Sequence, residues 1–369
     1  MAKLSLPELS AFIASFVDSQ VLSNPAFTKS ENNIAGLVDK IGKIATIDTS
    51  FADKLYMFDG EELSFGKIVE EWQQDLTLPS AYDENGAHAL APHYPSYRPV
   101  DYAYPCPKKV IATTVPYNNL ERAVHFEEQF ISLTAMITKR LYDSYAVYKY
   151  GIKRQALGEL ATLCVSAQTS AGSTAFQSST KYDVGTLVYN SSEFGIVVKP
   201  IAVADGLTWS TAKSGGYVIL FDLVETMSAP SDSTSGEAFV VKVKEAVEKA
   251  SDISEGHSLN GNTLGASEGL VLLVKQGIIP PVEVEVMAGA FHQDKVALPA
   301  EIVVVKDFGD ADSSIYGILM DRRGLILHND YLAVKEQLNA EGNFMNYYLH
   351  SEFTCKFSRN TFVRVFKSA

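Results

Sequence analysis

The stretch of sequence that decides the fold is residues 301–366, which read EIVVVKDFGDADSSIYGILMDRRGLILHNDYLAVKEQLNAEGNFMNYYLHSEFTCKFSRNTFVRVF. The stretch is dense in aromatic and β-branched residues, which favour strands. Residues 303–305 and 317–320 predict short buried strands, and residues 321–324 predict a charged turn between two of them. From Phe353 to Phe357, apolar and polar residues alternate, which is the period-two pattern of a half-buried strand. We therefore expect packed β-structure here and no catalytic group.

Length and composition indicate a globular protein. The 369 residues favour two domains or one elaborated fold, and an apolar fraction of 46% is ample for a core. The formal net charge of −13 argues against a protein that coats nucleic acid, because phosphate binding needs a clustered basic surface. The same charge is compatible with a protein that encloses nucleic acid without gripping it.

The cysteines and the apolar segments bear on the compartment. Cys106, Cys164 and Cys355 lie far apart without a C-x-x-C motif, which indicates three free thiols in a reducing cytoplasm. Pro7 and Glu8 interrupt the first residues, so they do not read as a signal peptide. No segment approaches the ~20 apolar residues of a membrane helix. We expect a soluble cytosolic protein with no membrane partner.

The first residues predict a thin region that needs support. Residues 5–18 predict an amphipathic helix, and residues 34–41 predict a second short one. The helical spacing of the first is set by Leu9, Phe12, Ile13, Phe16 and Val17. Because this region is too thin to fold alone, we expect an arm that lies on something else.

Residues 59–116 predict a long extended hairpin. Residues 65–76 begin as an apolar strand, 78–107 are rich in proline and tyrosine, and 109–115 predict a returning strand. Proline forbids a helix here, and excursions of this length are usually functional. Exposed aromatic residues suit a contact between proteins, although a loop folded back on its own domain is the alternative. The candidate subunit-contact residues are Trp72, Tyr82, Tyr94, Tyr97, Tyr102 and Tyr104.

A long helix and a mixed region complete the chain. Asn118 or Asn119 can cap a helix that reaches about Tyr148, before Gly151, and resumes toward Cys164. A Ser/Thr-rich segment, 168–180, marks a boundary. Beyond it, strands are predicted at 195–198, 217–224 and 282–286, and helices at 237–250 and 268–276, the second capped by Gly277.

One catalytic motif can be read from the sequence. Residues 265–269 fit the G-x-S-x-G elbow of serine hydrolases, with Ser267 as the nucleophile. The preceding residues are turn-like, and no acid stands in the right order before a histidine, so the hydrolase is a minor alternative. His88 and His93 lack a metal-site spacing, Asp307, Asp310 and Asp312 do not fit a calcium loop, and phosphate-binding glycine motifs are missing. We expect no enzyme activity, no metal and no cofactor.

In their order along the chain, these segments resemble the major capsid protein of tailed phages, especially of the small short-tailed podovirus phages. The resemblance covers most of residues 60–366, while 167–262 matches poorly. The segments that carry it are Phe65–Leu76 (FGKIVEEWQQDL), Asn119–Phe130 (NLERAVHFEEQF), Val282–Phe291 (VEVEVMAGAF), Ile302–Phe308 (IVVVKDF), Gly317–Leu327 (GILMDRRGLIL) and Leu338–Ser358 (LNAEGNFMNYYLHSEFTCKFS).

The resemblance implies an α+β chain with the Hong Kong 97-type capsid fold. The implied parts are an N-terminal arm (1–58), an extended β-hairpin loop (59–116), a peripheral domain with a long spine helix (117–166 and 330–369) and an axial domain (167–329). The implied function is self-assembly, as hexamers and pentamers, into an icosahedral phage head that encloses double-stranded DNA without sequence-specific binding. Scaffolding, portal and decoration proteins are implied as further partners, with synthesis in the cytoplasm of a bacterial host and a final place in the virion. The alternative with the same fold is an encapsulin-like shell loaded with an enzyme.

Overall fold

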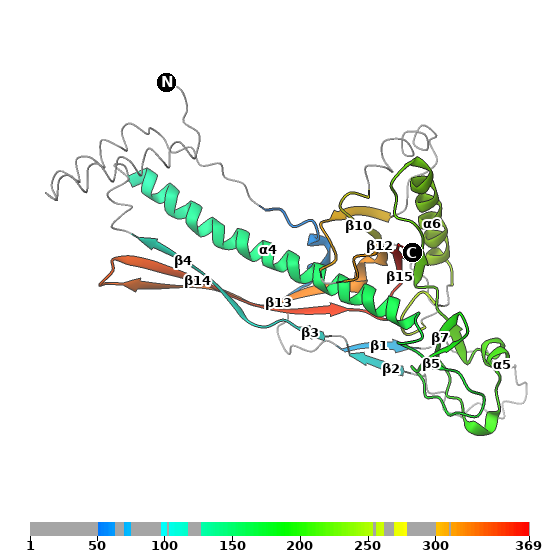
Figure 1. Ribbon diagram of the computed structural model, residues 1–369. Helices are drawn as coiled ribbons and strands as arrows, with labels where there is room; N and C mark the ends of the chain where they lie inside the picture. The colour runs from blue at the N-terminus through cyan, green and yellow to red at the C-terminus, as the bar shows by residue number, and fades with distance from the viewer. Residues whose placement is uncertain are drawn as a thin grey trace, which may run out of the picture. The chain divides into compact units, whose positions relative to one another are not determined.

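The computed structural model divides the chain into two compact units, which are described separately (Figure 1). Unit 1 comprises Met1–Ala52, Lys109–Ala146 and Leu332–Ser351, and unit 2 comprises Asp53–Lys108, Val147–Tyr331 and Glu352–Ala369. The structure describes residues 51–62, 70–74, 97–101, 103–116, 127–253, 256–261, 269–278, 300–309 and 311–368. The predicted helices at 5–18 and 34–41 and the predicted strand at 282–286 lie outside these residues.

The core of unit 2 is a mixed five-stranded sheet in the order β11-β10-β12-β15-β9. Its strands are β9 (Val224–Thr226), β10 (Leu270–Lys275), β11 (Ala300–Val305), β12 (Ile315–Asp321) and β15 (Val363–Lys367). The pairs β10–β11 and β15–β9 are parallel, and β10–β12 and β12–β15 are antiparallel. Every residue of β12 is buried, as expected of a central strand covered on both faces. The strands predicted at 303–305 and 317–320 are thereby confirmed.

Helix α6 (Ser233–Ser251) lies beside this sheet and closes its core (Figure 1). The helix begins where Asp232 accepts a hydrogen bond from the Ser235 backbone N–H, which satisfies one of the free donors of the first turn. Its apolar face places Phe239 in one cluster with Leu272 of β10 and Phe366 of β15. The helix predicted at 237–250 is confirmed and begins earlier than expected.

One predicted helix is wrong. Residues 268–276 were expected to be helical, but residues 270–275 form strand β10, and Gly277, the expected helix cap, follows a strand at φ +98°. The five residues Leu270 to Val274 are all buried between two neighbouring strands. A short apolar run of this kind satisfies the burial pattern of either structure, and the long-range pairing decides between them.

Helix α4 (Glu127–Ala167) is continuous for 41 residues, although a break was expected before Gly151. A Cβ at Gly151 would meet no atom within 4 Å, so no close packing requires a glycine there. Compared with alanine, the glycine lowers the stability of the helix by ~1 kcal/mol. Burial of the following turns, including Leu157 and Leu160, stabilises the helix against that cost. A Cβ at Gly158 would lie 2.0 Å from the Phe308 carbonyl oxygen, so the helix backbone approaches the segment after β11 closely. The predicted helix start at 118–119 lies outside the described residues.

A small module of unit 2 has its own sheet, in the order β5-β6-β7-β8. The strands are β5 (Thr174–Ala175), β6 (Leu187–Asn190), β7 (Glu193–Val197) and β8 (Val218–Leu220), accompanied by α5 (Trp209–Ser214). The ring of Phe176 stacks on Tyr182 and meets Trp209 edge-on, within a cluster separate from that around α6. The strand predicted at 195–198 is confirmed as β7. The one predicted at 217–224 is divided between β8 and β9.

A further sheet has the order β13-β14-β3, with β4 paired to another part of β14. The elements are β3 (Ala103–Pro105), β4 (Lys109–Pro116), β13 (Leu325–Asn339) and β14 (Phe344–Phe357). The strand predicted at 109–115 is confirmed as β4, but the predicted hairpin pairing is wrong, because the partner of β4 among the described residues is β14 and not the strand expected at 65–76. The predicted charged turn is the 3-10 turn η4 (Arg322–Gly324). The strand predicted at 353–357 is confirmed, but it is not half-buried, because Thr354 is also buried.

Candidate subunit-contact surface

The structure places the six predicted contact residues in different environments. Trp72 lies on β1 (Glu70–Gln74), which pairs antiparallel with β2 (Tyr97–Asp101), and its side chain is 59% exposed. Tyr97 begins β2 opposite Gln74, so the same two-stranded sheet carries both aromatic residues. Tyr104 belongs to β3 and pairs with Cys355 in another sheet. The remaining three, Tyr82, Tyr94 and Tyr102, lie outside the described residues.

We call the antiparallel pair of β1 and β2 the hairpin. Glu71, the neighbour of Trp72, connects this hairpin to the end of β14. One carboxylate oxygen accepts hydrogen bonds from the Ser358 hydroxyl at 3.0 Å and the Asn360 amide at 3.5 Å. The other lies 3.3 Å from the Lys356 ammonium, whose side chain is 14% exposed. The Ser358 hydroxyl in turn accepts a hydrogen bond from the Asn360 backbone N–H. We call this group of four residues the hairpin latch.

The segment before the hairpin is held to α4 by buried charge. The Lys153 ammonium donates to Asp53 at 2.7 Å and to the Leu55 carbonyl oxygen at 2.8 Å, and it pairs with Asp59. Lys149, one helical turn earlier, also pairs with Asp59, at 2.8 Å. The Lys153 side chain is 0% exposed, so these acceptors replace water around the ammonium. We call Lys153 with its acceptors the entry clamp.

The segment after the hairpin is held by backbone pairing. Cys106 donates its backbone N–H to the Phe353 carbonyl oxygen at 3.1 Å, and Lys108 pairs with Glu352 at 3.1 Å. Cys106, Cys164 and Cys355 are buried, and none of the three forms a disulfide. Burial raises the pKa of the Cys106 thiol to about 11 and raises the pKa of the other two thiols further. These thiols are therefore poor nucleophiles, because the thiolate is the reactive form.

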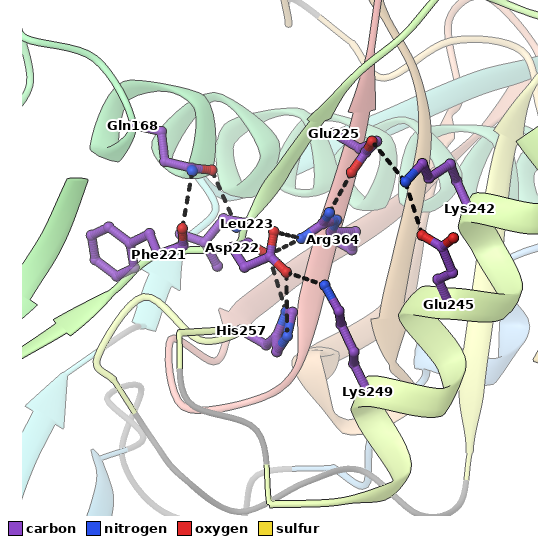
Figure 2. Close-up of polar contacts among 10 residues, drawn as sticks. All are labelled: Gln168, Phe221, Asp222, Leu223, Glu225, Lys242, Glu245, Lys249, His257 and Arg364. Atoms are coloured by element: carbon purple, nitrogen blue, oxygen red, sulfur yellow. Dashed lines mark hydrogen bonds and ion pairs between the residues drawn. The ribbon is translucent and has the colours of Figure 1, made fainter. Parts of the chain in front are cut away.

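A buried arginine organises the region where the small module rejoins the central sheet (Figure 2). Arg364 of β15 pairs with Asp222 and Glu225, and it donates to the Asp222 backbone carbonyl oxygen. Lys249 of α6 lies 2.9 Å from the Asp222 carboxylate. Gln168, just past α4, accepts a hydrogen bond from the Leu223 backbone N–H. This arginine clasp joins the end of α4, the linker 221–223, α6 and β15.

His257 shares Asp222 with this clasp. Its ring Nδ1 lies 3.0 Å from the Asp222 carbonyl oxygen. Burial lowers the pKa of His257, and the nearby Asp222 charge only partly opposes it. For Asp222, burial acts to raise the pKa, but the hydrogen bond from Lys249 and the charge of Arg364 outweigh it, so the pKa lies below its usual value. Ser267, the serine of the predicted elbow, lies outside the described residues.

Unit 1 carries an apolar stripe on β13. Leu332, Val334 and Leu338 alternate along the strand on one face, and their side chains are 41%, 37% and 59% exposed. In its sheet order β13 is an end strand beside β14. An exposed apolar row on an end strand is a typical feature of a surface that contacts another protein.

The described residues hold no cluster of His, Cys, Asp and Glu arranged for a metal ion. Among their helices, none combines the length and the apolar character needed to cross a membrane.

Sequence reasoning missed Glu71, Lys153 and Arg364. Their partners are far away in the sequence: 287 positions separate Glu71 from Ser358, 100 separate Lys153 from Asp53, and 142 separate Arg364 from Asp222. A lone charged residue in an amphipathic pattern predicts a solvated face, and nothing local marks these three as paired.

Comparison with known proteins identifies the family to which these elements belong. The family model of Phi29-like phage major capsid proteins matches residues 18–367. The major capsid protein of Bacillus phage GA-1 is 21% identical over 325 residues, which cover 85% of this chain and 56% of that protein. The major capsid protein of Bacillus phage PZA is 20% identical over 332 residues, covering 89% and 61%. The chain therefore spans about three fifths of the length of these curated relatives.

Solved structures agree on the fold. A chain in the capsid structure of Staphylococcus phage Andhra matches with a TM-score of 0.56 at 12% identity, covering 89% of this chain and 88% of that one. A chain in a structure of the head fibre and inner core protein of bacteriophage P68 matches with a TM-score of 0.52 at 12% identity, covering 89% and 87%. The predicted mixed helix-and-sheet fold of the Hong Kong 97 type is thereby confirmed.

Proposed function

This chain belongs to the Phi29-like phage major capsid protein family, and from that membership we propose that its copies associate into the closed icosahedral shell of a phage head. The family match over residues 18–367 is the observation that carries the proposal. In this proposal hexamers and pentamers of the chain tile the shell around double-stranded DNA. The virion is then its final location, after synthesis in the cytoplasm of a bacterial host.

The exposed side chains supply surfaces for contact between copies. Trp72 leaves 59% of its side chain exposed on a hairpin, a large apolar area for a tryptophan. Tryptophan and tyrosine dominate the binding energy of protein interfaces, because they bury a large rigid area with little loss of rotamer freedom. We assign Trp72 as a buried anchor between copies. The five tyrosines, Tyr82, Tyr94, Tyr97, Tyr102 and Tyr104, complete the proposed contact set.

The domain assignment follows from the same family. We propose residues 1–58 as the arm, 59–116 as the extended loop, 117–166 with 330–369 as the peripheral domain, and 167–329 as the axial domain. The long α4 suits the spine of the peripheral domain, and the apolar stripe on β13 suits a contact surface. Each contact between copies can be weak, because many contacts close one shell and multivalency compounds them.

The ion pairs of the structure favour a shell that encloses DNA without gripping it. Lys108, Lys149, Lys153, Arg154 and Lys356 each have an acidic partner. A cation already paired with a carboxylate has little capacity left to neutralise a phosphate. Together with a net charge of −13, this supports DNA held by enclosure. Scaffolding, portal and decoration proteins are proposed partners, and catalysis is not part of the proposal.

The experiment is to delete residues 78–107 from the full chain. The deletion removes β2, β3 and the five proposed contact tyrosines, and it leaves the four latch residues and the entry clamp in the chain. We expect a folded, soluble subunit that forms no shells by electron microscopy of negatively stained samples. Trp72→Ala should weaken assembly, whereas Val203→Ala, which truncates another exposed apolar side chain in the small module, should weaken it less. Normal shells from the deleted chain would contradict the assignment.

The contents of the shells test the DNA-enclosing role. Shells made during phage infection should protect DNA from nuclease, and a protein cargo in its place would indicate the encapsulin-like compartment. The serine hydrolase receives no support from the comparisons, since both curated relatives are major capsid proteins.

A further inference from the structure

We propose that Glu71 is a positioning residue for assembly, which fixes the direction of the β1–β2 hairpin within unit 2 and turns Trp72 outward. The inference rests on the proposed function, because it assigns the hairpin to contacts between copies. It adds a specific device: the hairpin latch of Glu71, Lys356, Ser358 and Asn360.

The latch partners form a rigid receptor. Ser358 and Asn360 are 3% and 7% exposed, and their own positions are fixed by further hydrogen bonds. Ser358 donates its backbone N–H to the Gly324 carbonyl oxygen at 2.8 Å. The Asn360 side-chain oxygen accepts a hydrogen bond from the Asn260 amide at 2.8 Å. Because these hydrogen bonds fix Ser358 and Asn360, the two residues can fix Glu71 in turn.

Because strand β1 is pleated, the contact between Glu71 and the latch also sets the direction of the Trp72 side chain. Successive side chains of a strand point to opposite faces, so Glu71 and Trp72 must face opposite ways. The Glu71 side chain is 25% exposed and faces the latch, while Trp72 is 59% exposed. A shift by one residue would exchange the two faces and bring the indole against the latch. The latch therefore determines which face of the hairpin presents the tryptophan.

The hairpin needs such a device because its own sheet is small. Within the sheets of the described residues, β1 has β2 as its one strand neighbour. A two-stranded ribbon is marginally stable in water without support from elsewhere. A contact surface that is ordered before association avoids the free-energy cost of ordering it during association. Loss of the latch should thus weaken assembly without unfolding the sheet core of unit 2.

The negative charge of Glu71 is balanced by the positive charge of Lys356. Lys356 is 14% exposed at its side chain, so its ammonium has little water to replace a lost carboxylate. In Glu71→Gln, the amide oxygen can still accept from Ser358, but the ion pair with Lys356 is lost. In Glu71→Lys with Lys356→Glu, the ion pair is restored with reversed charge, and the Ser358 hydroxyl can accept from the new ammonium.

Hydrogen exchange of the full-length, dissociated subunit measures the local effect, and light scattering measures the concentration at which shells form. In Glu71→Gln, we expect amides of 70–74 and 97–101 to exchange about tenfold faster, which corresponds to ~1.4 kcal/mol, while those of 270–275 are unchanged. The assembly concentration should rise about tenfold, and the charge-swapped double variant should recover most of both effects. The control is Glu301→Gln, which also removes a carboxylate on a strand, in this case one that pairs with Arg322 at 2.9 Å; it should change neither readout.

The possible results distinguish the latch inference from the proposed function. If wild-type subunits form no shells, the proposed function fails. If wild type and Glu71→Gln form shells at the same concentration, the latch inference fails and the proposed function stands. Faster exchange spread equally over 270–275 would also overturn the inference, because it would indicate a general loss of stability.

Discussion

Lys153→Met should destabilise the subunit by about 3 kcal/mol, because it removes the charge at the centre of the entry clamp. Methionine keeps the packing of the lysine stem, so the change removes the ammonium and its hydrogen bonds. The ammonium has three acceptors, the carboxylates of Asp53 and Asp59 and the Leu55 carbonyl oxygen. Removal of one partner from a buried ion pair typically costs ~3–5 kcal/mol. The lower end applies, because Asp59 is 36% exposed and retains Lys149.

Urea unfolding of the dissociated subunit, followed by circular dichroism, measures the change. With a slope of ~3 kcal/mol per M, a loss of ~3 kcal/mol lowers the unfolding midpoint by about 1 M. Lys181→Met is the matched control, since that lysine forms an ion pair with Asp183 in which both side chains are at least 66% exposed. The control should change the stability by less than ~1 kcal/mol.

A second variant separates the ion pair from the packing. Asp53→Ala in the Lys153→Met background should cost little more, because the aspartate has already lost its main partner. Equal midpoints for wild type and Lys153→Met, within ~0.2 M, would refute the reasoning and show that the buried charge contributes nothing net to folding.

The remaining predictions concern the titratable groups. Burial lowers the pKa of His257 below the usual ~6.5, so the unfolded chain binds a proton that the folded chain does not. The contribution of His257 to the free energy of unfolding is complete above pH ~6.5 and falls as the pH drops below that value. In His257→Gln, the urea midpoint should therefore change less between pH 7 and pH 5 than in the wild type. An equal dependence of the midpoint on pH in both proteins would contradict the role of His257. The pKa of Asp222 is also lowered, so a further loss should follow below pH ~4. Cys106 should react with a disulfide reagent at pH 8 about two hundredfold more slowly than an ordinary thiol, because a pKa of about 11 leaves little thiolate. Labelling of the native subunit at the rate of the urea-unfolded one would show that burial does not protect this thiol.

The strands and helices that the sequence predicts well are those whose burial follows a local period. Helix α6 is an example, because its apolar positions repeat at the helical spacing and an acidic N-cap precedes them. Strand β10 shows the opposite case. Its run of Leu270 to Val274 has no period at all, since both faces are buried, and only its pairing with β11 and β12 makes it a strand. That information lies 26 or more residues away in the sequence, and no local reading contains it.

In the candidate site, too, the local sequence predicts some features, and contacts distant in the sequence decide the others. The aromatic content of residues 59–116 predicts a contact segment by composition, and this stays a prediction; the structure places Trp72 with 59% exposure. What holds the segment could not be predicted, because Glu71 binds a serine 287 positions away and Lys153 an aspartate 100 positions away. Composition can predict that a surface contacts something. It cannot predict which charged residues fix that surface, because such residues look like any solvated charge until the fold brings their partners to them.

The two kinds of stabilisation in unit 2 have different physical consequences. Its cores, around Phe239 and around Trp209, rest on apolar burial, which is strong but has no preferred direction. The hairpin latch and the entry clamp rest on charge-assisted hydrogen bonds, which hold a specific direction and distance. In the proposed shell, a segment that meets a neighbouring copy at a defined angle needs the second kind at its base. Because Lys153 is buried and Lys356 nearly so, salt should screen these contacts far less than it screens ion pairs on the surface. The direction of the hairpin should therefore persist over the range of ionic strength in which weaker contacts between copies form and dissociate.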